Sequence, residues 1–549
     1  MPPDLTRLDC DVLVVGAGIG GLVSATQAAG RGWRTILATK GKIAGGASYF
    51  PKKASLGVQV TNDADDIEPF RYDIARAAQG MNDPSIVDAY LRDSPNVIDS
   101  LDAIGFEPWL RADGRPACFA AHARKIFMIG DWAGASQRAR DIVAGNEAIV
   151  PLERTGLVRI QTEAGRVVGA VLERDGEWLL VRCKTMILAT GGMASLYRHN
   201  LYPNHLYGGG HAAALEAGCE LVNMEYIQFI PGLVSPRYKV LFGEHTLKYC
   251  TGMFDREGRD LLADMSASAA QAMWAERSTY APFSTDYASR TFDTRMMQAI
   301  RAGSSGVRLT FHAALYEQRS DFYAVYLDWL KRDMGIDMCR DEICVAPFAH
   351  SCNGGIRIDD HGETAIAGLF AVGEVASAIE GANRLGGNSV GGSLVFARRA
   401  IETAARYIEA DRRAPSFDEI ERDFRRWCAS FDAAATSTLA PAAASDMLRS
   451  VRERLWADAN VLRDHASLST SLDVLDALDA ACNPLVCGFD AYHAVRVASV
   501  LMHAMRARTE SRGAHFRSDF PTADPRPYRQ IVSLRDGAIH IRREFDACE

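Results

Sequence analysis

The sequence lacks the paired cysteines that build disulfide frameworks and many metal sites. Its 12 cysteines are scattered along 549 residues, and no two of them form a CxxC pair. This spacing disfavours a disulfide scaffold, a zinc ribbon and an iron–sulfur cluster. We expect reduced thiols that mostly serve in packing, no metal site, and an organic molecule as any redox cofactor.

Long apolar runs and an excess of basic charge are also missing. No run reaches 18 apolar residues, so we expect no membrane-spanning helix. The opening stretch MPPDLTRLDC is polar, unlike a signal peptide. The formal net charge of −8 provides no basic field for nucleic acid or for an anionic membrane. We therefore expect a cytoplasmic protein that binds neither.

The N-terminal part has the pattern of a dinucleotide-binding fold. CDVLVVG is a continuous apolar run, typical of a strand buried in a parallel sheet. A glycine-rich turn, a small-residue helix over LVSATQAAGRG and a second buried strand, TILAT, follow it. Further strands are expected at Leu157–Thr162, Arg166–Arg174, Trp178–Val181 and 185–192. These patterns predict an α/β fold with a Rossmann-like domain.

This domain is predicted to be interrupted and later resumed. Residues 1–230 form its first part and residues 345–425 its second, because GLFAVGE returns to the buried-strand pattern. Residues 231–344 mix aromatic, Met and charged residues without a glycine-rich nucleotide signal, which predicts an inserted α+β capping domain. Residues 426–549 are rich in Ala, Leu and Arg with helical periodicity, which predicts a C-terminal helical domain. LAPAAAS (439–445) is expected to be a turn between its helices.

Two glycine-rich turns predict a nucleotide site. GAGIGG fits GxGxxG between a strand and a helix, where glycines let a pyrophosphate approach the helix N-terminus. ATGG also brings backbone near a dinucleotide, with a plain hairpin turn as the alternative. Thr39 and Lys40 end the second strand where an acid usually holds the ribose, which disfavours NAD and leaves FAD open. The predicted contacts of the two turns are Gly16, Ala17, Gly18, Gly20, Gly21, Ala189, Thr190, Gly191 and Gly192.

A third segment, AVGEVASAIEGANRLGGNSVGG, combines a strand end with a helix start. Glu374, directly after Gly373, can accept a hydrogen bond from a ribose hydroxyl. Asn388, Ser389 and Val390 open the helix, where backbone N–H groups can face the electron-rich end of a flavin ring. Such groups stabilise the negative charge that reduction places on the ring. This segment therefore favours FAD.

In this order, the three segments resemble the flavoprotein subunits of fumarate reductase and succinate dehydrogenase, and their soluble relative L-aspartate oxidase. The resemblance covers nearly the whole chain. It is most specific in HSCNGGIRID (350–359), GLFAVGEVAS…EGANRLGGNS (368–389) and ARTESRGAHFRSDFP (507–521). It implies an FAD-dependent oxidoreductase. The FAD contacts that it implies are Gly16, Gly18, Gly20, Gly21, Lys40, Ser48, Gly192, Glu374, Ser389 and Val390, to which we add Gly46.

The resemblance also implies substrate residues. His350 and Arg384 stand where the family clamps a substrate carboxylate beside the flavin, and Arg290 stands where it has a proton-transferring arginine. The chemistry agrees with a clamp, because a guanidinium helped by a histidine holds a carboxylate well. An arginine that transfers a proton needs coupling to a carboxylate, because its own pKa is above about 12. Asp286 and Glu244 are the candidates for that coupling.

The loop that lies near the flavin in the family departs from the usual pattern. Ala47 stands where some members carry the histidine that links covalently to FAD, so we expect a non-covalent flavin. The family's glycine pair is also lost, and Lys52 or Lys53 can lie near the flavin and favour its reduced anion. A solvated lysine pair is the alternative.

The family's HPT motif reads Ile230-Pro231-Gly232 here, and Gly209 replaces the Asp of its GDG motif. In the family, the His and Thr help to hold a second substrate carboxylate. Isoleucine can neither donate nor accept a hydrogen bond, and a charged group without a polar partner is strongly disfavoured. Either His245 and Lys248 replace this anchor, or the substrate lacks that carboxylate. We favour the second interpretation.

Three functions follow from the resemblance. The first is an FAD oxidase or dehydrogenase that removes hydride from L-aspartate or a related amino or carboxylic acid and passes electrons to O2 or another acceptor. The second is the reverse chemistry, reduction of a C=C bond conjugated to a carboxylate. The third is a flavoprotein subunit of a multi-chain electron-transfer complex, which would need partner chains.

The presence of His350, Arg384 and Arg290 disfavours a non-catalytic relative. The oligomeric state is open, and a homo-oligomer is compatible with the sequence.

The replacement of the linking histidine by Ala47 generates a direct prediction. We expect acid denaturation of the purified protein to release its yellow colour into the supernatant, because nothing at this position can bond to the flavin. The measurement is the absorbance of the supernatant and of the pellet at the flavin band. Colour that stays with the precipitated protein would contradict the expectation.

Overall fold

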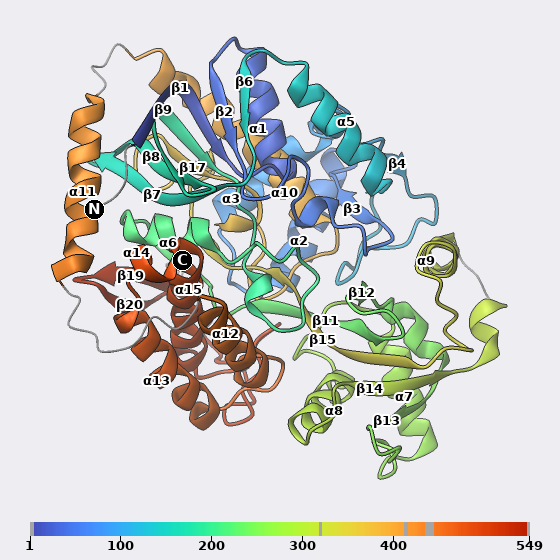
Figure 1. Cartoon of the computed structure of the whole chain (residues 1–549). Coiled ribbons are helices and arrows are strands. Elements are labelled where there is room, and N and C mark those ends of the chain that lie inside the picture. The colour runs from blue at the N-terminus through green and yellow to red at the C-terminus, as the bar shows by residue number, and fades with distance from the viewer. Residues whose placement is uncertain (1–4, 318–320, 411–414, 434–443, 546–549) are drawn as a thin grey trace.

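The structure is a computed structural model that describes residues 5–317, 321–410, 415–433 and 444–545. Figure 1 shows a sheet flanked by helices, a second α/β part at the lower right, and a helical part at the lower left. The α/β fold class with a C-terminal helical part, as predicted, is confirmed. Residues 439–443 of the predicted interhelical turn lie outside the described residues, and α12 (Ala444–Asp458) begins directly after them.

The main part is built on a seven-stranded sheet in the order β6-β2-β1-β9-β8-β7, with β17 paired to β9. Strands β6, β2, β1 and β9 pair in parallel, as does β17 with β9, whereas β7, β8 and β9 form the predicted antiparallel meander. Because β17 comes from the resumed part of the chain, distant segments share one sheet. The bounds are β1 Leu5–Val15, β2 Thr35–Ala38, β6 Ile149–Leu152, β7 Thr155–Glu163, β8 Arg166–Arg174, β9 Glu177–Leu188 and β17 Leu369–Ala371.

One strand differs from the sequence-based prediction. The stretches 178–181 and 185–192 are not two strands, because β9 runs unbroken through them and ends at Leu188. The charged residues between them interrupt the apolar run without breaking the strand. Arg182 Nε donates to Asp9 Oδ1 at 2.7 Å, and Lys184 Nζ lies 3.0 Å from Asp11 Oδ1, both across the β1–β9 pair.

Helices cover the sheet and support the turns at its carboxyl edge. Helix α1 packs against α10 beside β1 and β9, as can be followed in Figure 1. A small sheet in the order β3-β5-β4 lies beside them. The bounds are α1 Ile19–Gly30, α2 Ile67–Ala78, α3 Pro84–Asp93, α4 Asp99–Asp102, α5 Trp132–Ala144, α6 Gly209–Glu216, α10 Asn388–Ile408, β3 Leu56–Gln59, β4 Trp109–Leu110 and β5 Ile126–Ile129.

The inserted part has its own sheet, in the order β12-β11-β15-β14-β13, and its own apolar core. The antiparallel pair β11–β15 connects this part to the main one, and the predicted boundaries at 230 and 344 fall inside these two strands. The boundaries themselves stay predictions. The bounds are β11 Ile227–Ser235, β12 Val240–Leu241, β13 Cys250–Phe254, β14 Val307–Phe311, β15 Ile343–Cys352, α7 Ala267–Arg277, α8 Arg290–Arg301 and α9 Asp321–Arg332.

The C-terminal part is helical, as expected, but ends in a hairpin that the sequence did not predict. This hairpin extends a third sheet in the order β18-β16-β10-β19-β20, which joins it to segments of the main part. The helix bounds are α11 Phe417–Ala433, α13 His465–Ala481, α14 Pro484–Cys487 and α15 Phe489–Ala507, and the strand bounds are β10 Leu221–Val222, β16 Gly355–Arg357, β18 Ala376–Ser377, β19 Arg529–Arg535 and β20 Ala538–Glu544.

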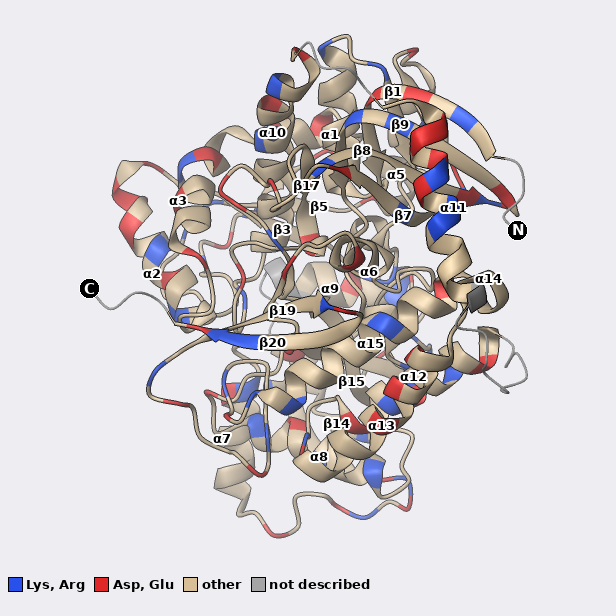
Figure 2. Cartoon of the chain, turned by 90° about the vertical axis from the view of Figure 1, so that its left-hand side faces the viewer, with Lys and Arg blue, Asp and Glu red and all other residues tan. Residues whose placement is uncertain are grey.

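Charge is distributed over the surface without an obvious block of one sign. Figure 2 shows acidic and basic residues interspersed on helices such as α3 and α11. Within the described residues, no helix combines the length and the apolar character that crossing a membrane requires.

A buried ionic network fastens the C-terminal part to the main part. Arg508 follows α15, and its side chain is paired with Glu225 and Glu510 while its Nη2 donates to Tyr528 O at 2.9 Å. Arg508 and Glu225 are both fully buried. A buried guanidinium requires such partners, because an unpaired charge in the interior is strongly destabilising.

Arg508→Ala is expected to lower the free energy of unfolding by about 3–5 kcal/mol, because it leaves buried carboxylates without their counter-charge. Urea denaturation followed by circular dichroism measures this change. Arg7→Ala is the matched control, because Arg7 forms an exposed ion pair with Asp418 that is screened by solvent. Equal effects of the two substitutions would contradict the structural role of the network.

Candidate functional site

A large cavity lies where the parallel strands of the main sheet end. Strands β1, β9 and β17 stop at Val15, Leu188 and Ala371, and the turns that follow all line this cavity, whose volume is about 380 Å³. The carboxyl edge of a parallel sheet is the usual place for a ligand. The predicted cofactor residues that line it are Gly16, Ala17, Gly18, Gly20, Thr39, Lys40, Gly46, Ser48, Ala189, Thr190, Gly191, Gly373, Glu374, Ser389 and Val390.

Glycines allow the first two turns to touch each other through backbone alone. A Cβ on Gly21 would lie 1.8 Å from Gly16 O, and a Cβ on Gly16, whose φ is +111°, would lie 2.1 Å from Ala189 O. Gly192 is similar, since its Cβ would lie 2.6 Å from the carboxyl carbon of Glu374. Gly21 and Gly192 do not line the cavity, so they shape it by permitting close packing.

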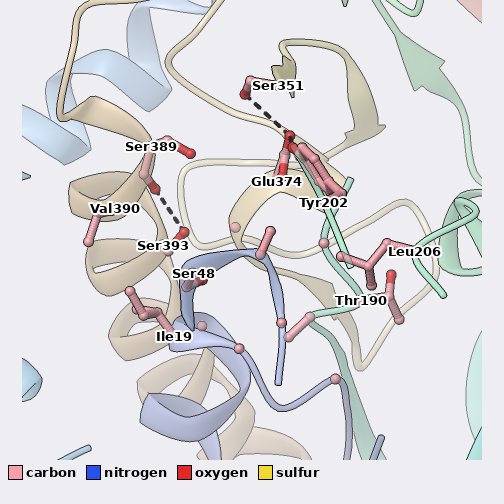
Figure 3. Close-up of a pocket in the computed structure, with 18 of the residues that line it drawn as sticks. Ile19, Ser48, Thr190, Tyr202, Leu206, Ser351, Glu374, Ser389, Val390 and Ser393 are labelled. Atoms are coloured by element: carbon pink, nitrogen blue, oxygen red, sulfur yellow. Dashed lines mark hydrogen bonds between the residues drawn. The ribbon is translucent and has the colours of Figure 1, made fainter. Parts of the chain in front are cut away.

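The second and third segments meet at Glu374, which Figure 3 shows facing Tyr202. Its Oε1 accepts hydrogen bonds from Cys352 N at 2.8 Å and from Ser351 Oγ at 3.2 Å, as well as from the Tyr202 hydroxyl. These contacts fix the carboxylate at the rim of the cavity. In the same view, Ser48 lies beside the first turn of α10.

Several buried polar atoms around the cavity have no protein partner, which fits a polar ligand. They are Thr190 Oγ1, His350 Nδ1 and His493 Nε2. Buried polar atoms in native proteins are almost always hydrogen-bonded, so a ligand or solvent is required here. A dinucleotide carries hydrogen-bond donors and acceptors on its phosphates, riboses and rings, which can pair with these atoms, and the glycine turns leave room for its pyrophosphate. The residues present therefore fit FAD.

Sequence reasoning missed the contribution of α15 and of the 202–207 loop. Asp490 and His493 on α15 line the cavity, and Asp490 pairs with Lys40, whose ammonium also lies 4.9 Å from the centre of the Tyr207 ring. Tyr202 lines the cavity as well. No local motif marks these residues, because they reach the cavity only through tertiary packing.

The cavity continues into a region with the predicted carboxylate clamp. His350 and Arg384 both line it, together with Lys53. Gln228 Oε1 accepts from Arg384 Nη2 at 3.1 Å and is itself oriented by the Asn383 side chain. Burial, with the charges of Lys53 and Arg384, holds the pKa of His350 well below its usual range, so the ring is neutral at pH 7. The remaining lining residues here are Arg111, Cys118, Ile230, Leu241, Ala281 and Pro282.

The two neighbouring lysines of the loop have different environments. The Lys53 side chain is buried at the cavity, whereas Lys52 Nζ turns away and donates to Tyr238 O at 3.0 Å. Lys53 is therefore not part of a solvated pair.

Arg290 does not line the cavity in this structure. Its Nη1 donates to Thr285 O at 2.6 Å, and its guanidinium lies over the Phe516 ring. Asp286, one candidate for coupling to it, accepts instead from Gln79 and Ser284. The proton-transfer role of Arg290 stays a prediction.

Three further predicted residues also lie outside the cavity lining. Burial raises the pKa of Glu244 to about 8, opposed by the nearby charge of Arg277. Burial and the charge of Lys248 lower the pKa of His245 to about 3. Asn388 accepts from Gln59 Nε2 at 3.3 Å, at the start of α10. The roles predicted for these residues stay predictions.

Family models match most of the chain. The "FAD binding domain" model matches residues 11–390, and the "Fumarate reductase flavoprotein C-term" model matches residues 448–542. The chain is 28% identical to a subunit of the fumarate reductase (CoM/CoB) of Methanothermobacter marburgensis, over 96% of this chain and 97% of that protein. It is 29% identical to L-aspartate oxidase of Caulobacter vibrioides, over 95% of this chain and 96% of that protein.

Solved structures share the fold. E. coli quinol fumarate reductase FrdA matches with a TM-score of 0.79 and 21% identity, over 98% of this chain and 97% of that one. Mycobacterium smegmatis Sdh1 matches with a TM-score of 0.78 and 22% identity, over 99% and 95%.

Gly21→Ala is expected to abolish FAD retention, because its Cβ would meet Gly16 O and open the turn below the cavity. The measurement is the ratio of flavin to protein absorbance after purification. Gly30→Ala, at the far end of the same helix, is the matched control, because a Cβ there meets nothing within 4 Å. A Gly21→Ala protein that keeps its full flavin content would contradict the role of this turn.

Proposed function

This chain belongs to the FAD binding domain family and is an FAD-dependent oxidoreductase; from that premise we propose that it removes hydride from an amino acid or a related carboxylic acid. The observation that carries the proposal is that His350 and Arg384 line the same cavity as the three glycine-rich segments. The proposed substrate is thus a small acid held next to the flavin, with O2 or another molecule as the final electron acceptor.

The residues of the chain bind and orient the acid. Arg384 supplies a guanidinium for the carboxylate, and Gln228 limits its rotation. Neutral His350 can donate one hydrogen bond to the same carboxylate. When bound, FAD supplies the acceptor for the two electrons. Holding the carboxylate in one place orients the neighbouring C–H bond toward the flavin. Such positioning is a large part of what a protein contributes to the reaction.

Part of the cavity wall is apolar. Ile230, Leu241 and Pro282 line it where the family's polar HPT residues would add hydrogen bonds. L-Aspartate or a related acid is the proposed substrate, because several similar proteins are named L-aspartate oxidase. The replacement of the HPT motif favours a specialised substrate among these acids.

A second candidate is reduction of a C=C bond conjugated to a carboxylate, and it is favoured by the similarity to a fumarate reductase. The same clamp serves both directions, since it holds the carboxylate and not the bond that changes. That relative is one chain of a larger enzyme by its name, which also supports the alternative of a flavoprotein chain that works with partner chains.

Arg384→Ala is expected to lower kcat/KM by a factor of at least about 100 while FAD stays bound, because about 3 kcal/mol of charge-assisted binding is lost. The assay mixes the flavoprotein with candidate acids without oxygen and follows the flavin absorbance.

Bleaching by an amino acid, followed by peroxide release on admitting oxygen, supports the oxidase. Fast reoxidation of the reduced flavoprotein by an enoate, with slow reaction with oxygen, supports the reductase. Turnover by Arg384→Ala equal to wild type would remove the carboxylate clamp from the proposal.

A further inference from the structure

Lys53 places a buried ammonium group at the wall of the cavity. Its side chain is only 5% exposed. Its Nζ has a single weak hydrogen bond, to Ala47 O at 3.5 Å, and forms no ion pair with any carboxylate in the part of the chain that the structure describes. A buried charge without a partner is costly, so a group at this position is retained only if something compensates it.

The loop that carries Lys53 is held on both sides. At its start, a Cβ on Gly46 would lie 3.4 Å from Gly18 Cα, and at its end Gly57 packs near Gly387. Trp132 Nε1 donates to Lys53 O at 2.7 Å, which fixes the backbone from which the side chain projects. The ammonium therefore occupies a defined place between the first glycine turn and the third segment.

The charged and titratable groups near Lys53 are Arg384, His350, Tyr202, Glu374 and Glu380. Arg384 and His350 share its cavity, and the ring of Tyr202 lies 6.0 Å from Nζ. The Glu374 carboxylate is a nearby negative group that raises the pKa of Lys53, and its Oε1 accepts hydrogen bonds from Tyr202, Ser351 and Cys352. Glu380, near Arg384, is a second carboxylate, and burial raises its pKa to about 7. Arg111, at the outer wall, has its own carboxylate partner in Asp113 at 2.7 Å. Lys53 and Arg384 thus face one cavity, and among the described residues neither forms an ion pair with a carboxylate.

We propose that Lys53 is a substrate-binding residue whose ammonium holds an anionic group of the substrate, in place of the polar anchor that Ile230 and Gly232 cannot provide. This inference rests on the proposed function. The other residues considered for that role, His245 and Lys248, do not line the cavity. With Arg384, Lys53 gives the site two cationic groups, which suit an acid with two anionic groups, in place of the expectation from the sequence that the substrate lacks the second one.

The pH dependence of binding follows from the state of this ammonium. Burial lowers the pKa of Lys53 to about 8, with Glu374 opposing the shift and Arg384 adding to it. The charged form is present below that pKa and is lost as the pH rises through it. Affinity for an acid with two anionic groups therefore falls above pH 8, whereas affinity for a monoacid held by Arg384 changes less.

The test measures equilibrium binding to the FAD-loaded protein of two four-carbon probes, succinate and butyrate, which differ by one carboxylate. Titration calorimetry or the shift in the flavin spectrum reports binding without turnover. The wild type is expected to bind succinate on the order of tenfold to a hundredfold more tightly than butyrate. Lys53→Met removes this preference, and Lys53→Arg retains it beyond pH 8 because a guanidinium stays charged. Lys52→Met, the adjacent lysine bonded to Tyr238 O, leaves it unchanged.

The outcomes separate this inference from the proposed function. If Lys53→Met keeps the preference for succinate while Arg384→Ala loses binding of both probes, the role of Lys53 is overturned and the clamp stands. If Arg384→Ala binds both probes as the wild type does, the clamp itself is wrong. Wild type that binds neither probe would overturn both. The flavin content of each variant, measured by absorbance, excludes loss of the cofactor as the cause.

Discussion

The site depends on direct backbone contact between the turns that follow β1 and β9. Gly21 and Gly16 leave room for carbonyl oxygens where any side chain would collide, and this contact lets α1 start close to the sheet. Once these turns are fixed, the third segment can meet them, because β17 pairs with β9 and Val372 packs against Gly20. The cavity is the space that remains beyond these three strand ends. Adding one methyl group to a glycine of these turns would therefore shift the residues that contact the cofactor.

Electrostatics divide the cavity into two regions. Near the 202–207 loop and α15, Lys40 is balanced by Asp490, and Glu374 Oε1 accepts hydrogen bonds from three donors. Near the predicted clamp, Glu374 and Glu380 lie in the neighbourhood of Lys53 and Arg384, but among the described residues neither cation forms an ion pair with a carboxylate. Such asymmetry attracts anions and strengthens their hydrogen bonds where water is excluded. Ile230, which stands at the position of the HPT histidine, and the buried Lys53 thus line the same cavity.

Much of the fold could be predicted because buried strands and glycine turns leave local patterns. The apolar run of β1 and the GAGIGG turn can be recognised from the local sequence, because a buried strand and a tight glycine turn each require particular residue types. Pairing is not local, and this is why the sequence pattern divides β9 at Arg182 and Lys184, which meet acidic residues on β1. The pairing of β19 with β10 is remote in the same way, whereas the hairpin β19–β20 is local, and its Asp536-Gly537 turn is a signal that the sequence-based prediction overlooked. In the site, motif positions indicate His350 and Arg384, but only packing distinguishes buried Lys53 from Lys52 and brings Asp490 and His493 to the cavity.

The central claim is that cofactor and acid occupy one cavity, with the acid held by His350 and Arg384. A crystal structure of the FAD-loaded protein soaked with a small carboxylic acid tests it most directly. The account predicts flavin density beside Ser48 and Ser389, and a carboxylate within hydrogen-bond distance of His350 and the Arg384 guanidinium. Acid density found only outside this cavity would contradict it.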